Sequence, residues 1–413
     1  MKNNYRIVFM GTPDFCLPAL SAMVEHGYTP VAAYTQPDKI NGRGKKINFS
    51  PVKTFAMAHD IPIHQPLSFK DPSEVEVLKA LKPDLLVVIA YGRILPKAVL
   101  DIPTYGAINV HASLLPKYRG AAPIQRVIID GEKKTGVTIM QLDQGMDTGN
   151  IVETVQMDIP LHMTAGELFD ALGEMGAKAL ISVLDDLPEK LARSTPQDHE
   201  KATYAEKVTK EMGAIDWTKD AKVLDALIRG MYPNPGTYTF FRGKRVKIHR
   251  AKVSEGESKE APGTIISTKD GLTIACGKGA LTISSLQPEN HKRMAAGDFV
   301  NGYQVKVNDT HSTAKPVPSA RRLAYQALYD VLEKDAYSNI VLQRILAEYP
   351  LKAEEAHLLT ELVYGVLRKY NHLLWIIGKL STQKVKKLHP SVRILLAISL
   401  YPVSYTHLRA HET

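Results

Sequence analysis

The 413-residue sequence predicts an open α/β sheet, followed by a small antiparallel β-barrel and an all-helical region. The first half alternates apolar, strand-like runs with amphipathic, helix-like segments. Over Pro233–Ile283 the chain changes to short β-branched runs separated by Gly and Pro, which indicates small antiparallel strands. From Ala320 to Leu400 the apolar residues recur at helical spacing. A chain of this length is expected to form two or three domains.

Each element of the first half is predicted from a local pattern. Leu85–Ala90 (LLVVIA) is apolar at every position, which is typical of a parallel strand covered on both faces. Asp14–Glu25 has the apolar spacing of a helix, and Thr164–Leu187 is expected to be a long helix begun by the capping-box pair Thr164 and Glu167. The expected strands are Tyr5–Met10, Pro30–Thr35, Ile61–His64, Leu85–Ala90, Ala107–His111 and Val137–Gln141.

The domain boundaries are predicted from changes in composition. The pattern of alternating strands and helices ends near Lys207, and the polar stretch Val307–Pro318 contains two prolines, as a linker does. The last ten residues, SYTHLRAHET, have little to bury and are expected to be an artefactual tail. The predicted organisation is a catalytic domain over 1–207, a barrel over 208–310, a linker over 311–318, a helical domain over 319–403 and the tail over 404–413.

The formal net charge of +9 is unevenly distributed along the chain. Residues 1–207 hold 22 basic and 24 acidic side chains, so the positive excess lies entirely in residues 208–413. Two basic C-terminal segments favour a polyanionic partner, with nucleic acid as the leading case. The alternative is that these lysines and arginines form solvated surfaces without a ligand.

Several classes of protein are excluded by what the sequence lacks. Two cysteines, Cys16 and Cys276, are too few for a disulfide scaffold or a cysteine-rich metal module. No P-loop, dinucleotide-binding glycine motif, H-E-x-x-H or G-x-S-x-G is present, and no metal is expected. The chain starts in a predicted strand without a signal peptide, and its apolar runs are too short for a bilayer, so we expect a cytoplasmic protein without a membrane partner.

Three polar residues in the first half are the candidates for catalysis. Asn109 and His111 are two residues apart on a predicted strand, so their side chains point to the same face. They lie at its C-terminal end, where open α/β sheets bind their ligands. Asp147 follows 36 residues after His111, in a loop flanked by Gly145 and Gly149. An amide, an imidazole and a carboxylate are thus expected to converge.

This trio is suited to acyl transfer without a covalent enzyme intermediate. When an amine attacks a formyl carbon, a tetrahedral centre with a developing oxyanion forms, and Asn109 or protonated His111 can donate a hydrogen bond to that oxygen. Asp147 is expected to favour the imidazolium form and to assist proton transfer through water. The alternative is a capped strand end with a hydrogen-bonded histidine that has no catalytic role.

The wider motif favours catalysis. Asn-x-His-x-Ser-Leu-Leu-Pro, followed by Leu-Asp-x-Gly-x-Asp-Thr-Gly, resembles the 10-formyltetrahydrofolate-dependent formyltransferases. This resemblance implies a Rossmann-like sheet, with 10-formyltetrahydrofolate as co-substrate. It also implies catalytic roles for Asn109, His111 and Asp147. The residues then expected around the folate are Ser113, Leu114, Leu115, Pro116 and Asp143.

Three further stretches narrow the resemblance to the methionyl-tRNA formyltransferase family over residues ~5–310. They read IVFMGTPDF, TQPDKINGRGKK and RGAAPIQR. The family's inserted basic loop enters the tRNA acceptor stem through an arginine, and its C-terminal domain is an OB-like barrel that helps to hold tRNA. The implied substrate is initiator methionyl-tRNA. The candidate tRNA contacts are Lys39, Arg43, Lys45 and Lys46 in the loop and Arg245 and Lys247 on the barrel.

The helical region resembles a different family. ARRLAYQALYDVL and LLTELVYGVLRKYNHLLWII are similar to the NusB-like RNA-binding domain, which also begins a family of ribosomal RNA cytosine-C5 methyltransferases. No Pro-Cys nucleophile or S-adenosylmethionine loop follows, so we predict no methyl transfer by this chain. The resemblance implies binding to other RNA, with Arg321, Arg322, Arg368 and Lys369 as candidate contacts.

Two other functions remain open from the sequence. The first is formyl transfer to another amine, such as a sugar nucleotide or glycinamide ribonucleotide; the cationic loop and the basic barrel speak against it. The second is a non-catalytic RNA-binding fusion protein, against which the intact trio speaks.

Overall fold

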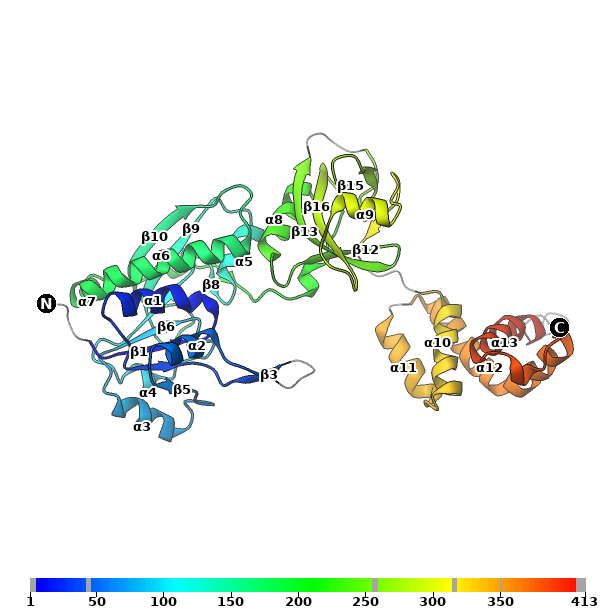
Figure 1. Cartoon of the computed structure of the whole chain (residues 1–413), viewed down its shortest axis with the longest axis horizontal. Helices are drawn as coiled ribbons and strands as arrows, with labels where there is room; N and C mark the ends of the chain where they lie inside the picture. Colours follow the sequence, from blue (N-terminus) through cyan, green and yellow to red (C-terminus); the bar gives the residue numbers. More distant parts are fainter. Residues whose placement is uncertain (1–4, 42–45, 255–258, 314–317, 350, 406–413) are drawn as a thin grey trace. The chain divides into compact units, whose positions relative to one another are not determined.

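The computed structural model describes residues 5–41, 46–254, 259–313, 318–349 and 351–405. The chain divides into two compact units, residues 1–314 and 315–413 (Figure 1).

A mixed β-sheet forms the centre of the first unit. Its strands are β1 (Ile7–Gly11), β2 (Ala32–Tyr34), β5 (Ile63–His64), β6 (Leu85–Ile89), β7 (Ala107–His111), β9 (Lys134–Gln141) and β10 (Ile151–Asp158). They are arranged in the order β10-β9-β7-β6-β1-β2-β5. The strands from β7 to β5 run parallel to one another, whereas β9 and β10 are antiparallel additions at one edge. The expected Rossmann-like α/β architecture is therefore confirmed.

Helices cover both faces of this sheet because alternate side chains of each strand enter different cores. Ile7 and Phe9 of β1 pack in one cluster with Leu20 and Leu168, whereas Val8 and Met10 pack in another. In Figure 1, α1 and α6 lie along one face, and α3 and α4 lie on the other. The helices are α1 (Leu17–Glu25), α2 (Pro51–Ala58), α3 (Pro72–Ala80), α4 (Lys97–Leu100), α5 (Pro123–Ile129), α6 (Ala165–Asp185) and α7 (Leu187–Ala192).

The structure corrects several predicted boundaries. The predicted helix Asp14–Glu25 begins with a 3-10 turn, η1 (Asp14–Cys16), before α1. The predicted capping box of Thr164 and Glu167 is present, but α6 ends at Asp185 and a separate α7 follows. Strand β10 was not predicted, because none of its residues is fully buried at the edge of the sheet.

A second, antiparallel sheet follows in the same unit. Its strands are β12 (Thr237–Phe241), β13 (Lys244–Ser254), β14 (Ile265–Ser267), β15 (Leu272–Ala275), β16 (Ala280–Pro288), β17 (Met294–Ala295) and β18 (His311–Ser312). Their order is β14-β15-β16-β13-β12-β18, with β17 beside β16. The sheet curls around a core that includes Val246, Ile248 and Phe299, and α8 (Ala221–Met231) and α9 (Ala296–Gly302) pack on that core.

Strand β18 lies within the segment predicted as a linker over 311–318. His311 pairs with Phe241 of β12, its ring stacks on the Phe241 ring at 4.9 Å between centroids, and its side chain is buried. This packing extends the antiparallel sheet to Ser312.

The two sheets of the first unit are joined through helices and polar contacts. Helix α8 packs against α5 of the catalytic half. The Gly166 amide donates to the Tyr232 carbonyl at 3.0 Å, and Arg250 of β13 pairs with Glu167 of α6 at 3.6 Å. Short elements complete this unit: the hairpin β3 (Lys39–Asn41) and β4 (Lys46–Asn48), the pair β8 (Arg119–Gly120) and β11 (Tyr204–Ala205), and the 3-10 turns η2 (His199–Lys201) and η3 (Glu211–Gly213).

The second unit is helical, as predicted. Its core contains Leu323, Leu328, Leu362, Val366 and Ile394. The elements are α10 (Ala320–Glu333), α11 (Ser338–Glu348), α12 (Ala353–Leu380), the 3-10 turn η4 (Val385–Lys387) and α13 (Pro390–Tyr405). Helix α13 thus extends two residues into the predicted tail, and the rest of that tail, residues 406–413, lies outside the described residues.

Two separate hydrophobic cores of the first unit each hold one free cysteine. Cys16 and Cys276 are both buried. Burial raises the pKa of each thiol to about 12, so both remain protonated at neutral pH.

Candidate active site

The predicted catalytic residues meet at the C-terminal end of β7. Asn109 and His111 of this strand, together with Asp147 of the loop after β9, line a cavity of about 550 Å³. This is the edge at which an open α/β sheet binds ligands. The rest of the cavity wall is mainly apolar, including Phe15, Val88, Tyr91, Leu95, Ile124, Leu142 and Phe169.

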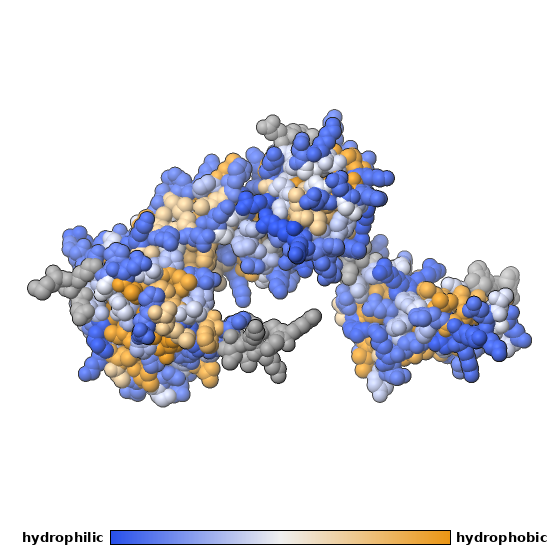
Figure 2. Space-filling view, viewed as in Figure 1, coloured by the Kyte–Doolittle hydropathy of each residue, from blue (hydrophilic) through white to orange (hydrophobic). Residues whose placement is uncertain are grey.

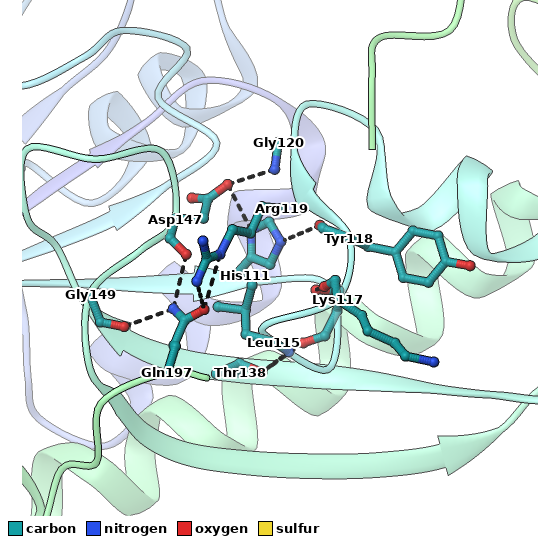
Figure 3. Close-up of polar contacts among 11 residues, drawn as sticks. His111, Leu115, Lys117, Tyr118, Arg119, Gly120, Thr138, Asp147, Gly149 and Gln197 are labelled. Carbon is teal, nitrogen blue, oxygen red and sulfur yellow. Dashed lines mark hydrogen bonds and ion pairs between the residues drawn. The ribbon is translucent and has the colours of Figure 1, made fainter. Parts of the chain in front are cut away.

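His111 is fixed in one orientation by a main-chain carbonyl. Its ring is 6% exposed, and its Nε2 is 2.9 Å from the Tyr118 carbonyl oxygen (Figure 3). A carbonyl oxygen only accepts hydrogen bonds, so Nε2 carries a proton and donates it. The other nitrogen, Nδ1, faces the Asp147 carboxylate, with 3.8 Å between Nδ1 and Oδ2. In the neutral imidazole, Nδ1 is therefore the acceptor nitrogen.

The Asp147 carboxylate is held by the main chain. The Gly120 amide donates to its Oδ2 at 2.8 Å. The Asp147 backbone has a φ of +54°, a left-handed conformation that non-glycine residues adopt infrequently. At Gly149 a Cβ atom would meet the Gln141 carbonyl oxygen at 1.9 Å, so glycine is required where this loop returns to β9.

Asp143 shapes the same loop and also borders the cavity. Its Oδ1 accepts hydrogen bonds from the Gly145 amide at 2.9 Å and from the Thr148 hydroxyl at 2.6 Å. The side chain is exposed, and the residue is part of the cavity lining.

The segment Ser113–Pro116, expected near the folate, is not part of that lining. The Ser113 hydroxyl donates to the Lys117 carbonyl at 2.7 Å, and the Leu115 amide donates to the Thr138 hydroxyl at 3.2 Å. These hydrogen bonds stabilise the turn that places the Tyr118 carbonyl next to His111.

Two further residues of the site were missed by the sequence analysis. Arg119 is 2% exposed and Gln197 is 5% exposed, and their side chains are hydrogen-bonded to each other beside Asp147 (Figure 3). Both are polar types that are normally exposed, and they are far apart in sequence. The only local signal is that Arg119 lies inside the RGAAPIQR stretch.

The candidate tRNA contacts fall in two places. Lys39 lies on β3 and Lys46 on β4 of the short hairpin. Arg43 and Lys45 lie outside the described residues. On β13, Val246 and Ile248 are buried and Lys247 between them is exposed. The Arg245 guanidinium stacks over the Tyr238 ring, 3.6 Å from its centroid. Figure 2 shows strongly hydrophilic side chains over this part of β12 and β13.

Among the described residues, every helix is too short or too polar to span a bilayer. The same part of the chain brings together no group of three or more His, Cys, Asp or Glu side chains that could hold a metal ion.

Family models identify the class of this protein. The model described as formyl transferase matches residues 5–184, and the formyl transferase C-terminal domain matches 207–304. The NusB family model matches 318–411. The fold and the trio thus belong to a formyltransferase that is followed by a NusB-family segment.

Curated relatives make the assignment specific. The methionyl-tRNA formyltransferase of Alkaliphilus oremlandii is 45% identical over 302 residues, which cover 73% of this chain and 97% of the relative. That of Acetivibrio thermocellus is 46% identical over 302 residues, with the same shares. The chain belongs to the methionyl-tRNA formyltransferase family, and the resemblance stated from the sequence is confirmed.

Solved structures share the fold. HypX from Aquifex aeolicus in complex with tetrahydrofolic acid superimposes with a TM-score of 0.52 at 15% identity, covering 81% of this chain and 58% of that one.

Proposed function

We propose that this chain transfers the formyl group of 10-formyltetrahydrofolate to the α-amino group of methionine on charged initiator tRNA. The observation that carries the proposal is the convergence of Asn109, His111 and Asp147 on one cavity, in a chain that spans 97% of its formyltransferase relatives. The products are N-formylmethionyl-tRNA and tetrahydrofolate. Since the product serves translation initiation, the proposal also places the protein in the cytoplasm.

The cavity has the size and chemistry for the folate substrate. Its volume of about 550 Å³ falls within the range of small-molecule sites, and its apolar walls suit a flat heterocycle. We propose that Asp143 lies beside the folate. We also propose that Ser113, Leu114, Leu115 and Pro116, in the turn next to His111, lie around the folate.

The reaction requires stabilisation of a negative charge on the formyl oxygen. The amine nitrogen forms a bond to the formyl carbon, the bond from that carbon to the folate nitrogen breaks, the amine loses a proton and the folate nitrogen gains one. Asn109 reaches the cavity with an amide N–H that can donate to the developing oxyanion. In a site shielded by apolar walls, such a donor is worth more than it would be in water.

His111 and Asp147 are placed to move the proton. Because Nε2 of His111 is committed to the Tyr118 carbonyl, Nδ1 is the nitrogen that accepts a proton and returns it. The separation of 3.8 Å from Asp147 Oδ2 is longer than a direct hydrogen bond. It is short enough for the carboxylate to stabilise the charged ring and to orient a bridging water.

Transfer RNA is proposed to bind on two basic surfaces. One is the loop that carries Lys39, Arg43, Lys45 and Lys46, with Arg43 as its main contact. The other is the exposed face of β13, with Arg245 and Lys247 on a sheet that we propose to be an OB-like barrel. Both surfaces are suited to phosphates, which dominate the affinity of nucleic-acid binding.

The domain organisation proposed above assigns these roles to 1–207 and 208–310. The helical domain over 319–403 belongs to a separate NusB-family segment and is proposed to bind other RNA through Arg321, Arg322, Arg368 and Lys369.

A formylation assay tests the proposed function. The purified full-length chain is incubated with 10-formyltetrahydrofolate and, separately, with charged initiator tRNA, charged elongator tRNA and a small amine. We expect formylation of the charged initiator tRNA. Transfer to the small amine at an equal kcat/KM would indicate the alternative formyltransferase, and no transfer to any acceptor would indicate an RNA-binding protein.

A further inference from the structure

One short segment, Tyr118–Gly120, contacts both catalytic side chains. The Tyr118 carbonyl accepts from His111 Nε2, and the Gly120 amide donates to Asp147 Oδ2 (Figure 3). The residue between them, Arg119, has its side chain buried at 2% exposure. After the Tyr118 carbonyl and the Gly120 amide, the Arg119 guanidinium is the third polar group of this segment that lies at the site.

The Arg119 side chain is joined to the Asp147 loop through Gln197. Arg119 Nε and Nη2 both donate to Gln197 Oε1, at 3.1 and 2.7 Å. Gln197 Nε2 in turn donates to the carbonyl oxygens of Asp147 at 2.9 Å and Gly149 at 2.7 Å. The carboxamide therefore uses its full capacity of two accepted and two donated hydrogen bonds.

These contacts require both an acceptor and a donor at position 197. A guanidinium only donates and a backbone carbonyl only accepts, so the group between them must accept on one side and donate on the other. A carboxamide does this without charge, and the partners fix which of its ends is oxygen. Glutamate has nearly the same shape but cannot donate to Asp147 and Gly149.

Burial of Arg119 has a cost that hydrogen bonds to a neutral partner offset only in part. Arg119 forms no ion pair with a carboxylate among the described residues, and the remaining polar contact of its side chain is Nη2 to His199 Nδ1 at 3.1 Å. A buried charge without a counter-ion is unfavourable for stability. The burial of Arg119 is explained by the loop that it helps to hold. In this loop the catalytic residue Asp147 has the left-handed φ of +54°.

We propose that Arg119 and Gln197 are positioning residues for formyl transfer, which act by fixing the Asp147 loop against His111. This inference rests on the proposed function. It predicts that releasing the loop slows the chemical step while both substrates still bind.

The test is Gln197→Glu in the full-length chain. The new carboxylate forms an ion pair with Arg119, so the fold is retained, but it repels the carbonyl oxygens of Asp147 and Gly149. We expect kcat to fall roughly 10²-fold, as displacements of about 1 Å do, with the KM of tRNA and of folate unchanged. The matched control is Gln326→Glu, the same exchange on an exposed position of α10, which should leave kcat unchanged.

Two more variants separate positioning from a structural role. Arg119→Lys keeps a donor to Gln197 and should retain more activity than Arg119→Met. In an Asp147→Asn background, Gln197→Glu should cost much less than in the wild type, because it acts through Asp147. Full additivity of Gln197→Glu and Asp147→Asn, or a wild-type kcat for Gln197→Glu, would overturn the proposal.

A second measurement does not depend on activity. Hydrogen exchange of the Gly120 amide should accelerate in Gln197→Glu, because its acceptor on Asp147 is released, while exchange in β13 stays unchanged. Unchanged exchange at Gly120 would also overturn the proposal. If the wild type formylates no tRNA, the proposed function fails, and this measurement still decides whether Gln197 holds the loop.

Discussion

At the scale of single residues, the proposed mechanism assigns charge stabilisation to one side chain and proton transfer to a pair. Asn109 and His111 share one strand face and reach the same cavity, but only His111 is tied to the backbone. Asp147 approaches from a different loop. We infer the proposed roles from the hydrogen bonds that these side chains already make: His111 Nε2 is bonded to the Tyr118 carbonyl, which leaves Nδ1 for proton transfer.

Asn109→Ala removes the proposed oxyanion donor. We expect kcat to fall about 10²- to 10³-fold, equivalent to roughly 3–4 kcal/mol, with little change in KM because the interaction forms in the transition state. Single-turnover formylation of charged initiator tRNA measures this directly. A loss expressed in KM alone would instead assign Asn109 to substrate binding.

The three candidate catalytic residues could be predicted from the sequence, but the two residues that hold the Asp147 loop, Arg119 and Gln197, could not. Asn109 and His111 are adjacent on a strand face, and Gly145 and Gly149 mark the loop of Asp147, so the signals are local. The contact between Arg119 and Gln197 spans 78 positions, and both side chains belong to types that sequence patterns predict as exposed. Only the folded chain brings them together.

At the scale of elements, strands were predictable where burial makes them uniformly apolar. Leu85–Ile89 of β6 is buried at every position and was predicted, whereas the half-exposed edge strand β10 was missed. Strand β18 was missed because the residues around it are polar, and one of them, His311, is buried by stacking on Phe241.

The burial of His311 predicts a pH dependence of stability. Desolvation lowers the pKa of this imidazole from 6.5 to about 3, and neither ring nitrogen has a hydrogen-bond partner in the described part of the chain. The unfolded state therefore binds a proton below pH 6.5 that the folded state does not bind. Stability is fully present above that pH and is lost progressively as the pH falls toward 3.

Urea unfolding of wild type and His311→Leu at pH 7 and pH 5 measures this effect. Between these pH values the wild type should lose about 2 kcal/mol more of its free energy of unfolding than the variant does. Equal losses in both proteins would show that His311 is protonated, or accessible to water, in the folded state.

The exposed face of β13 predicts a salt-dependent effect on tRNA binding. Lys247→Ala should raise the KM of tRNA and reduce the slope of log affinity against log salt by about 1 for a lost phosphate contact. Lys269→Ala, an exposed lysine in the turn between β14 and β15, is the matched control. An identical slope in the two variants would remove this face from the tRNA site.

At the scale of the whole molecule, two units of different family are joined in one chain. The methionyl-tRNA formyltransferase relatives are matched over 97% of their length by the part of this chain that precedes the helical unit. In the described part of the chain, the residues that line the cavity of Asn109, His111 and Asp147 belong to the first unit. Formyl transfer should therefore be independent of residues 315–413.

Deletion of residues 315–413 tests this independence. We expect kcat/KM for charged initiator tRNA to stay within about twofold of the full-length value, as for distant and uncoupled sites. A larger fall would show that the helical unit contributes to tRNA binding, and it would appear in KM rather than in kcat.

The two buried cysteines make it possible to measure local unfolding around each sheet separately. Because Cys16 lies in the core of the α/β sheet and Cys276 in that of the antiparallel sheet, labelling by a thiol reagent reports separately on the two. At neutral pH the folded chain should react slowly at both, since the thiolate forms only when the surrounding core exposes the sulfur. Mass spectrometry of partly labelled protein would then rank the opening rates of these two cores without any added probe site.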